Sequence, residues 1–262
     1  MAYETITTDI KNGVCTVRLN RPEVRNALGL LARNELRDFF SKASEDEAIR
    51  SIVLTGSGPA FSAGGDLSQM EELDPIKGRK RLQSGHAMIQ SMIQLEKPII
   101  AAVNGAAAGA GVSVALASDI IVAASSSVFI QSFVHVGLIP DLGSIYFLPR
   151  LVGRHKAMEL MMTGERISAA EAHRLGIVNQ VVDDEILLDE AQKLAQMLSD
   201  GPSHSIGLTK RLINRSILSD IEHTLEEEGL AQGICFQTDD FQEGRKAFFE
   251  KRKPNFRAWT EG

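Results

Sequence analysis

The middle of this chain holds a run of nine small or turn-forming residues, VNGAAAGAG at 103–111. The apolar segment KPIIAA precedes this run, and the apolar segment VSVALASDIIVAA follows it. Short apolar segments bounded by turn residues are typical of buried strands, and glycine lets a backbone come close to its neighbours. The run therefore predicts a tight connection between buried elements, at a point where something approaches the main chain.

A second loop rich in glycine, AFSAGGDL at 60–67, also follows an expected strand. Neither loop is followed by the G-K-S/T of a phosphate-binding loop. The segment GAG at 109–111 begins like the dinucleotide fingerprint G-x-G-x-x-G, but its sixth place is Val114. Close packing of a helix on a strand would explain one such loop. Two of them suggest a shared task, in which each loop aims a backbone N–H into one pocket and the pair forms an oxyanion hole.

The surrounding pattern predicts an α/β body followed by a helical tail. We expect strands over residues 13–19, 51–56, 98–103, 119–124 and 178–182. Apolar residues at helical spacing predict helices over 27–42, 80–95, 185–199, 203–218 and 220–251. The motif Ser168-x-x-Glu171 is typical of a capping box that opens a further helix, which Gly176 ends. Long helices at a terminus often pack on another subunit, so the tail predicts an oligomer.

Composition excludes several classes of protein. The 262 residues carry a net charge of −6, which disfavours a general grip on nucleic acid, because such a grip needs a basic face. Cys15 and Cys235 lack the spacing of a metal site, and we expect both to be reduced thiols in a cytoplasmic protein. The N-terminus does not resemble a secretory signal. Asn104, Gly105 and Asp119 interrupt the longest apolar stretches, so no membrane span is expected.

Six segments together resemble the crotonase superfamily, also called the enoyl-CoA hydratase/isomerase family, over nearly the whole chain. They are LNRPEVRNAL (19–28), AFSAGGDL (60–67), KPIIAAVNGAAAGAGVSVALASDI (97–120), VGLIPDLGSIYFLPRLVG (136–153), LMMTGERISAAEAHRLGIVNQVV (160–182) and FFEKRKPNF (248–256). The resemblance implies an α/β fold, a spiral of ββα units over residues 1–200, with a helical trimerisation region over 201–262. It also implies a homotrimer or a dimer of trimers.

The same resemblance implies an acyl-CoA thioester as substrate, with coenzyme A arriving as part of it and no separate cofactor or metal. The shared chemistry of the family is an enolate whose thioester oxygen is held by two backbone N–H groups. Carried over by position, these donors are Gly65 and Ala110. Donors of this kind typically contribute a few kcal/mol each to catalysis.

The acid and base residues, rather than the oxyanion hole, define the reaction. Hydratases of the family carry two glutamates, at the positions of Ser113 and Phe133 here, so ordinary hydration is disfavoured. Asp141 lies where several isomerases and a dehalogenase of the family have a working aspartate. Its alternative role is to cap a helix that begins near Leu142. We expect burial beside Phe133 to raise the pKa of Asp141.

The phrases AAGAG, GLIPD, LPRLVG and AEAHRLGIVNQVVDDE are most similar to members of the 1,2-epoxyphenylacetyl-CoA isomerase type, which belong to phenylacetate degradation. Asp141 would then move a proton between carbons of the bound acyl group, and isomerisation of a 3-enoyl-CoA would use the same parts. The alternatives are a hydratase, an aryl-CoA dehalogenase, a non-catalytic acyl-CoA-binding subunit and an RNA-binding protein. His86 occurs at the spacing of a catalytic histidine in the dehalogenases, but the tryptophan of those enzymes is replaced by Phe133.

The family pattern also places several residues along the substrate. Arg25 lies where family members meet the nucleotide end, and Lys251 would reach the nucleotide, including that of a neighbouring subunit. His86 and Phe133 are expected to contact the substrate. Backbone groups of four further residues would line the pantetheine channel: Ala27, Ala63, Asp66 and Leu67. Asp66 has the alternative role of capping the next helix.

Overall fold

The computed structural model describes residues 3–70 and 74–257, and it contains two sheets. The larger one has six strands in the order β1-β2-β3-β5-β7-β10. Strand β1 pairs with β2 in antiparallel orientation, and the other pairs are parallel. The strands are β1 (Ile6–Lys11), β2 (Val14–Leu19), β3 (Ser51–Gly56), β5 (Ile99–Val103), β7 (Ile120–Ala124) and β10 (Gln180–Val182).

The smaller sheet has the order β4-β6-β8-β9, with strands of three residues each. It comprises β4 (Ala60–Ser62), β6 (Ala106–Ala108), β8 (Val128–Ile130) and β9 (Arg166–Ser168). Strands β3, β5 and β7 of the larger sheet are each followed by one strand of the smaller sheet and then by a helix. This repeated ββα order confirms the predicted spiral.

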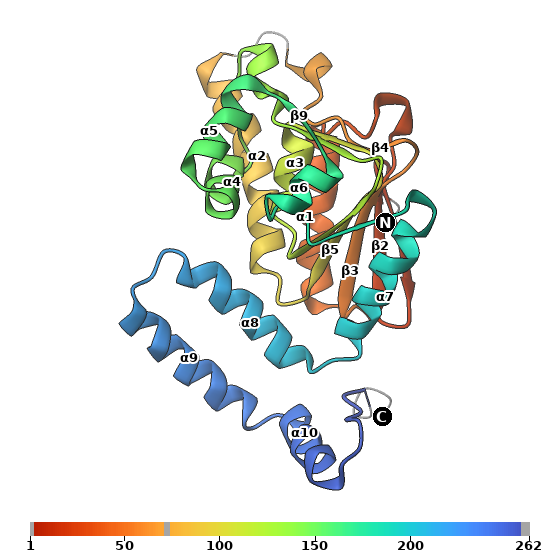
Figure 1. The fold of residues 1–262 in the computed structure, drawn as a ribbon, viewed down its shortest axis with the longest axis vertical. Coiled ribbons are helices and arrows are strands. Elements are labelled where there is room, and N and C mark those ends of the chain that lie inside the picture. The colour runs from red at the N-terminus through yellow and green to blue at the C-terminus, as the bar shows by residue number, and fades with distance from the viewer. Residues whose placement is uncertain (1–2, 71–73, 258–262) are drawn as a thin grey trace.

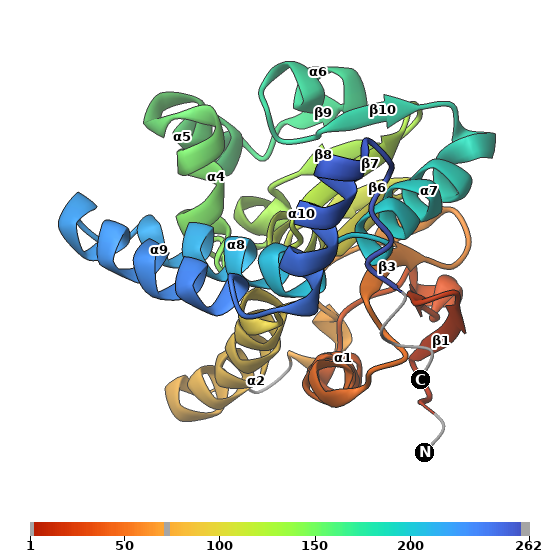
Figure 2. The same ribbon diagram turned by 90° about the horizontal axis from the view of Figure 1, so that it is seen from below.

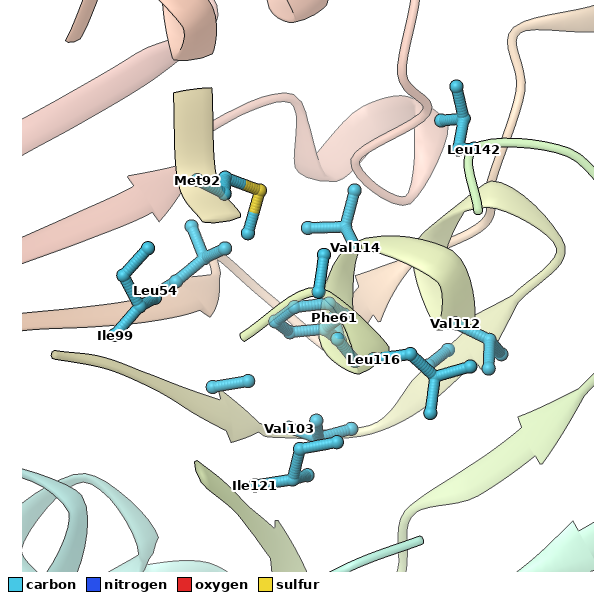
Figure 3. Close-up of a cluster of buried hydrophobic side chains, with 14 of the residues drawn as sticks. Leu54, Phe61, Met92, Ile99, Val103, Val112, Val114, Leu116, Ile121 and Leu142 are labelled. Atoms are coloured by element: carbon cyan, nitrogen blue, oxygen red, sulfur yellow. The ribbon is translucent and has the colours of Figure 1, made fainter. Parts of the chain in front are cut away.

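Helices cover both faces of the larger sheet (Figure 1). On one face, the main core joins α1 (Leu30–Glu45), α2 (Pro75–Gln94) and α3 (Ala110–Leu116) to the sheet. Figure 3 shows part of this core, with Phe61, Val114 and Leu142 among the labelled side chains. On the other face, α7 (Leu187–Ser199) buries Leu187, Ala191 and Ala195. Three shorter helices complete the body: α4 (Ser144–Val152), α5 (Arg154–Thr163) and α6 (Ala169–Arg174).

The last three helices extend away from the two sheets (Figures 1 and 2). They are α8 (Ser203–Ser216), α9 (Ile221–Cys235) and α10 (Asp239–Glu250). Helix α8 is tied to the body by Lys210, whose Nζ lies 2.8 Å from the Asp119 carboxylate and donates to the carbonyl of Lys97. Large apolar side chains stay exposed on α8 and α9: Ile213, Ile221, Leu225, Leu230 and Ile234.

The sequence-based elements agree with the structure in most places, but the helices α3 and α5 were not predicted and α2 begins five residues before the predicted 80–95. Ser168 accepts a hydrogen bond from the N–H of Glu171, which confirms the capping box of α6. The prediction of one helix over 220–251 is wrong, because the chain breaks after α9 and the Thr238 side chain caps a new helix, α10. Strand β1 and the short strands of the second sheet were not predicted. No helix in the described part of the chain is long and apolar enough to cross a membrane.

Candidate functional site

The two glycine-rich loops pack against each other through their main chains. Gly64 has a φ of +93°, and a Cβ added there would lie 2.5 Å from the carbonyl oxygen of Ala108 and 3.2 Å from the nitrogen of Ala110. A Cβ on Gly111 would lie 2.6 Å from the carbonyl oxygen of Ser62. Side chains are therefore excluded at these points because another backbone occupies the space.

A small cavity of about 150 Å³ lies beside this contact. Gly65 from one loop and Ala110 from the other both line it. Ala110 is the first residue of α3, so its N–H has no acceptor within the helix. Within residues 3–70 and 74–257, neither the Gly65 nor the Ala110 N–H donates a hydrogen bond. The remaining lining residues are Ala63, Leu67, Met70, Gly109, Ser132, Phe133, His135, Val136, Leu138 and Asp141.

A second, larger cavity of about 670 Å³ meets the first one at Asp141. Met70 and Leu138 also line both cavities. The larger cavity is mainly apolar, with His86 from α2 beside Asp141. Its other lining residues are Gly78, Arg81, Leu82, Ile139, Pro140, Leu142, Gly143, Ile145, Tyr146 and Arg150. Asp141 thus lies at the junction of a small cavity with free amides and a large apolar cavity.

Two local features hold Asp141 at this junction, and a third observation removes its alternative role as a helix cap. Gly143, not Asp141, is the N-cap of α4, so the capping alternative is wrong. Leu142 is fully buried in the core although its φ is +50°, a strained value for a bulky residue. Ser113 on α3 donates its hydroxyl to the carbonyl oxygen of Asp141 at 2.9 Å. The buried Leu142 and the buried Ser113 therefore fix the main chain at the carbonyl of Asp141 and at the residue after it.

The Asp141 carboxyl lies in an unfavourable environment for a negative charge. Its Oδ1 atom is buried and has no hydrogen-bond partner in the described residues. Burial raises its pKa above the usual range, and the charges of Arg33, His86 and Arg81 oppose this rise. This rise in the pKa of Asp141 agrees with the sequence-based expectation. A raised pKa is common for carboxyl groups that transfer protons near neutral pH.

The raised pKa of Asp141 predicts a gain in stability when its charge is removed. Because the folded-state pKa exceeds the unfolded one, the carboxyl costs nothing below the unfolded pKa, and its cost is complete above the folded pKa. We therefore expect Asp141→Asn to unfold at a higher temperature near neutral pH, by roughly 2–4 °C for each kcal/mol gained. Thermal unfolding at neutral pH and near pH 4 measures this. An equal difference at both pH values would contradict the charge argument.

The positions that carry glutamates in hydratases hold no acid here. Ser113 is fully buried and its hydroxyl is engaged with the Asp141 carbonyl. Phe133 contributes a phenyl ring to the small cavity. Among the described residues that line the two cavities, Asp141 is the only carboxylate. The described lining residues therefore provide one carboxylate, whereas the two-glutamate mechanism of hydratases needs two.

The Ser113 hydrogen bond leads to a testable expectation. We expect Ser113→Ala to lower kcat about fivefold, since a loss near 1 kcal/mol in positioning corresponds to that change in rate. Ser113→Thr retains the hydroxyl and is the matched control. Steady-state kinetics of both variants on an acyl-CoA that the wild type converts would check this. Equal kcat values for the alanine and threonine variants would contradict a positioning role for the hydroxyl.

Four other predicted site residues do not line either cavity. Arg25 is exposed in a left-handed conformation, and its carbonyl accepts from the Ala63 N–H. Ala27 is buried outside both cavities. The carboxylate of Asp66 makes an ion pair with Arg21 and makes no helix-capping hydrogen bond. Lys251 is the C-cap of α10 and lines neither cavity of this chain.

One buried charge at the site escaped the sequence analysis. Arg33 is 1% exposed, and it acts electrostatically on Asp141. It precedes Leu36 by three residues and Phe40 by seven, so it occupies the apolar stripe of α1. The occurrence of a charged residue within this apolar stripe was the sequence signal that could have identified Arg33 as a buried charge. Ser113 was identified only as a missing glutamate, because nothing in the sequence shows its contact with a loop 28 residues away. No cluster of metal ligands occurs in the described residues.

Comparison with known proteins agrees with this architecture. The enoyl-CoA hydratase/isomerase family model matches residues 9–259. A 1,2-epoxyphenylacetyl-CoA isomerase of Escherichia coli (strain K12) is 39% identical over 258 residues, covering 97% of this chain and 98% of that protein. A crotonyl-CoA hydratase of Syntrophomonas wolfei is 38% identical over 257 residues, covering 98% of this chain and 99% of that protein.

Solved structures show the same fold. An enoyl-CoA hydratase from Polaromonas sp. JS666 superimposes with a TM-score of 0.92 at 37% identity, covering 95% of this chain and 98% of that one. An enoyl-CoA hydratase of Mycobacterium smegmatis gives a TM-score of 0.93 at 33% identity, covering 97% and 100%. These matches, together with the ββα spiral and the paired loops, establish that the chain belongs to the enoyl-CoA hydratase/isomerase family, the crotonase superfamily, whose members are enzymes acting on acyl-CoA.

Proposed function

We propose that this chain is an acyl-CoA isomerase that moves a proton by way of a thioester enolate. The observation that carries the proposal is the position of Asp141, the single carboxylate among the described lining residues, between the free amides and the apolar cavity. An isomerase needs one group that removes a proton and returns it elsewhere. A hydratase of the two-glutamate type needs a second carboxylate to activate water. The names of the relatives include both activities, and the single carboxylate among the described lining residues favours the isomerase.

In the proposed reaction, the thioester oxygen binds in the small cavity and accepts hydrogen bonds from the N–H groups of Gly65 and Ala110. The Asp141 carboxylate removes a proton from a carbon of the acyl group. Negative charge that develops on the oxygen is stabilised by the two amides, which are already oriented by the packed loops. For a 3-enoyl-CoA, the proton leaves C2, the protonated Asp141 returns it to C4, and the double bond moves from C3–C4 to C2–C3.

The larger cavity supports an apolar acyl group of considerable size. Its volume of about 670 Å³ is within the range of cavities that bind small molecules. Substrates of the ring-epoxide type or of the 3-enoyl type would place their acyl group there. Coenzyme A would remain part of the substrate and no separate cofactor would be needed.

The direct test is to incubate the protein with a 3-enoyl-CoA in D2O and to analyse the products by mass spectrometry and by the absorbance of the conjugated thioester. The proposal predicts a 2-enoyl-CoA product with deuterium in the acyl chain. If a 3-enoyl-CoA is untouched, simple enoyl isomerisation is excluded and a ring-epoxide acyl-CoA is tested in the same way. Hydration of a 2-enoyl-CoA as the dominant activity would contradict the proposal.

The exposed apolar residues of α8 and α9 support a homotrimeric or hexameric assembly, as the family resemblance implied. Apolar patches that are rimmed by polar residues commonly mark interfaces. Light scattering coupled to size-exclusion chromatography measures the mass. A monomer of 28.5 kDa at micromolar concentration would contradict this part of the proposal.

A further inference from the structure

Arg33 is a charge placed inside the protein core with few partners. The residue is 1% exposed, and its Nε atom donates to the carbonyl oxygen of Leu28 at 3.1 Å. Its Nη1 atom is buried without a hydrogen-bond partner among the described residues. Burying a guanidinium is costly unless an opposite charge offsets the lost hydration, and arginine does not escape this cost by losing its proton.

The guanidinium lies between the amide loop and the segment that carries Asp141. A Cβ on Gly65 would lie 3.8 Å from its Nη2 atom, and a Cβ on Gly85 would lie 3.4 Å from its Nη1 atom. The side chain of Leu142, the residue after Asp141, fills the same space beside Gly85. Glycine is a poor helix former, but α2 has no room for a side chain at position 85. The Arg33 guanidinium therefore lies near Gly65 in the amide loop and near the space filled by Leu142, the residue after Asp141.

The charges that act on Asp141 come from two helices. Arg33 on α1 has the largest favourable effect on its carboxylate, followed by His86 and Arg81 on α2. Asp141 is in turn the only negative group found to act on Arg33 in the described part of the chain. Other titratable or charged groups that line the two cavities are His135, Tyr146 and Arg150. Arg33 and Asp141 each have one buried polar atom with no partner among residues 3–70 and 74–257.

We propose that Arg33 is a positioning residue for Asp141, a buried cation that holds the carboxylate ionised beside the Gly65 loop. The inference rests on the proposed function, because it explains how a base in an apolar cavity keeps its charge. Hydrogen bonds to the described residues do not require an arginine at this place, since Arg33 makes one such bond there out of the five that it can donate. A charge acting on Asp141 gives the residue a function that an apolar side chain cannot supply.

The test compares the pH dependence of kcat/KM in Arg33→Met, Arg33→Lys and the wild type. Asp141 must be ionised to accept a proton, so activity falls as the pH falls through its pKa. Removal of the cation shifts the fall in kcat/KM to higher pH. We expect the loss of kcat/KM in Arg33→Met, relative to the wild type, to be about tenfold greater at acidic pH than at the pH plateau. Arg33→Lys keeps the charge and should follow the wild-type limb. Circular dichroism and thermal unfolding verify that both variants fold.

A second readout separates this inference from the proposed function. Protein labelled with ¹³C at the aspartate carboxyl carbon is titrated by NMR without substrate, and the Asp141 signal is identified by its absence in Asp141→Asn. A higher titration midpoint for Asp141 in Arg33→Met than in wild type supports the inference. An unchanged midpoint overturns it, even if Asp141 proves essential for turnover. If Asp141→Asn stays active, the proposed function fails, while the titration still decides whether Arg33 controls the charge of Asp141.

Discussion

Replacing Asp141 by asparagine is expected to lower kcat/KM about 10²- to 10⁴-fold, the range typical of a removed general acid or base. Asparagine has nearly the same shape and retains the buried Leu142 and the Ser113 hydrogen bond to the main chain. It cannot accept a proton at catalytic pH. The loss should therefore be in kcat, with little change in the affinity for acyl-CoA.

The matched control for this variant is Asp189→Asn. Asp189 is an exposed carboxylate in the first turn of α7 and lies outside both cavities. Its kinetics should equal those of the wild type. Wild-type turnover by Asp141→Asn would contradict the assignment of the proton transfer to this residue, and it would favour the non-catalytic acyl-CoA-binding alternative.

Replacing Ala110 by proline is expected to lower kcat about 10²- to 10³-fold, as for removal of one oxyanion donor. Proline lacks the N–H, and it is well tolerated at the first position of a helix, where that N–H has no partner in the helix. The preceding Gly109 has a ψ of −119°, outside the helical region that a following proline disfavours. The variant therefore removes the donor with little demand on the fold.

Ala110→Gly is the control for the proline variant, because it keeps the N–H while the methyl group is lost. Glycine at this place costs about 1 kcal/mol of helix stability. We expect its kcat to stay within a fewfold of the wild type. If proline and glycine lower kcat equally, the effect arises from packing around α3 and not from the missing donor.

The sequence allowed prediction of the parts of the site that are local. Two loops with small residues and the aspartate of GLIPD each carry their signal within a few positions, and the structure brings Gly65, Ala110 and Asp141 to the same cavity. Their catalytic roles remain predictions. Phe133 lines that cavity as well, and His86 lines the larger one.

The features of the fold and of the site that were not predicted depend on contacts between segments that are distant in the sequence. Strands of three residues, such as β4 and β6, are too short to show an alternating pattern. The break between α9 and α10 depends on the Thr238 cap within an otherwise continuous helical pattern. Arg33 lies in the apolar stripe of α1, but the packing of α1 against α2 is needed to show that its charge is buried. The glycines exclude side chains because the opposite loop lies there, which no single loop can indicate.

The most direct measurement of the central claim is the exchange of α-protons of a saturated acyl-CoA, such as butanoyl-CoA, in D2O, followed by mass spectrometry. This exchange needs only the enolate, the two amides and the base, so it does not require knowledge of the natural acyl group. We predict deuterium incorporation by the wild type and by Asp189→Asn, and almost none by Asp141→Asn or Ala110→Pro. Undiminished exchange in Asp141→Asn, or no exchange in a wild type that binds the acyl-CoA, would contradict the account.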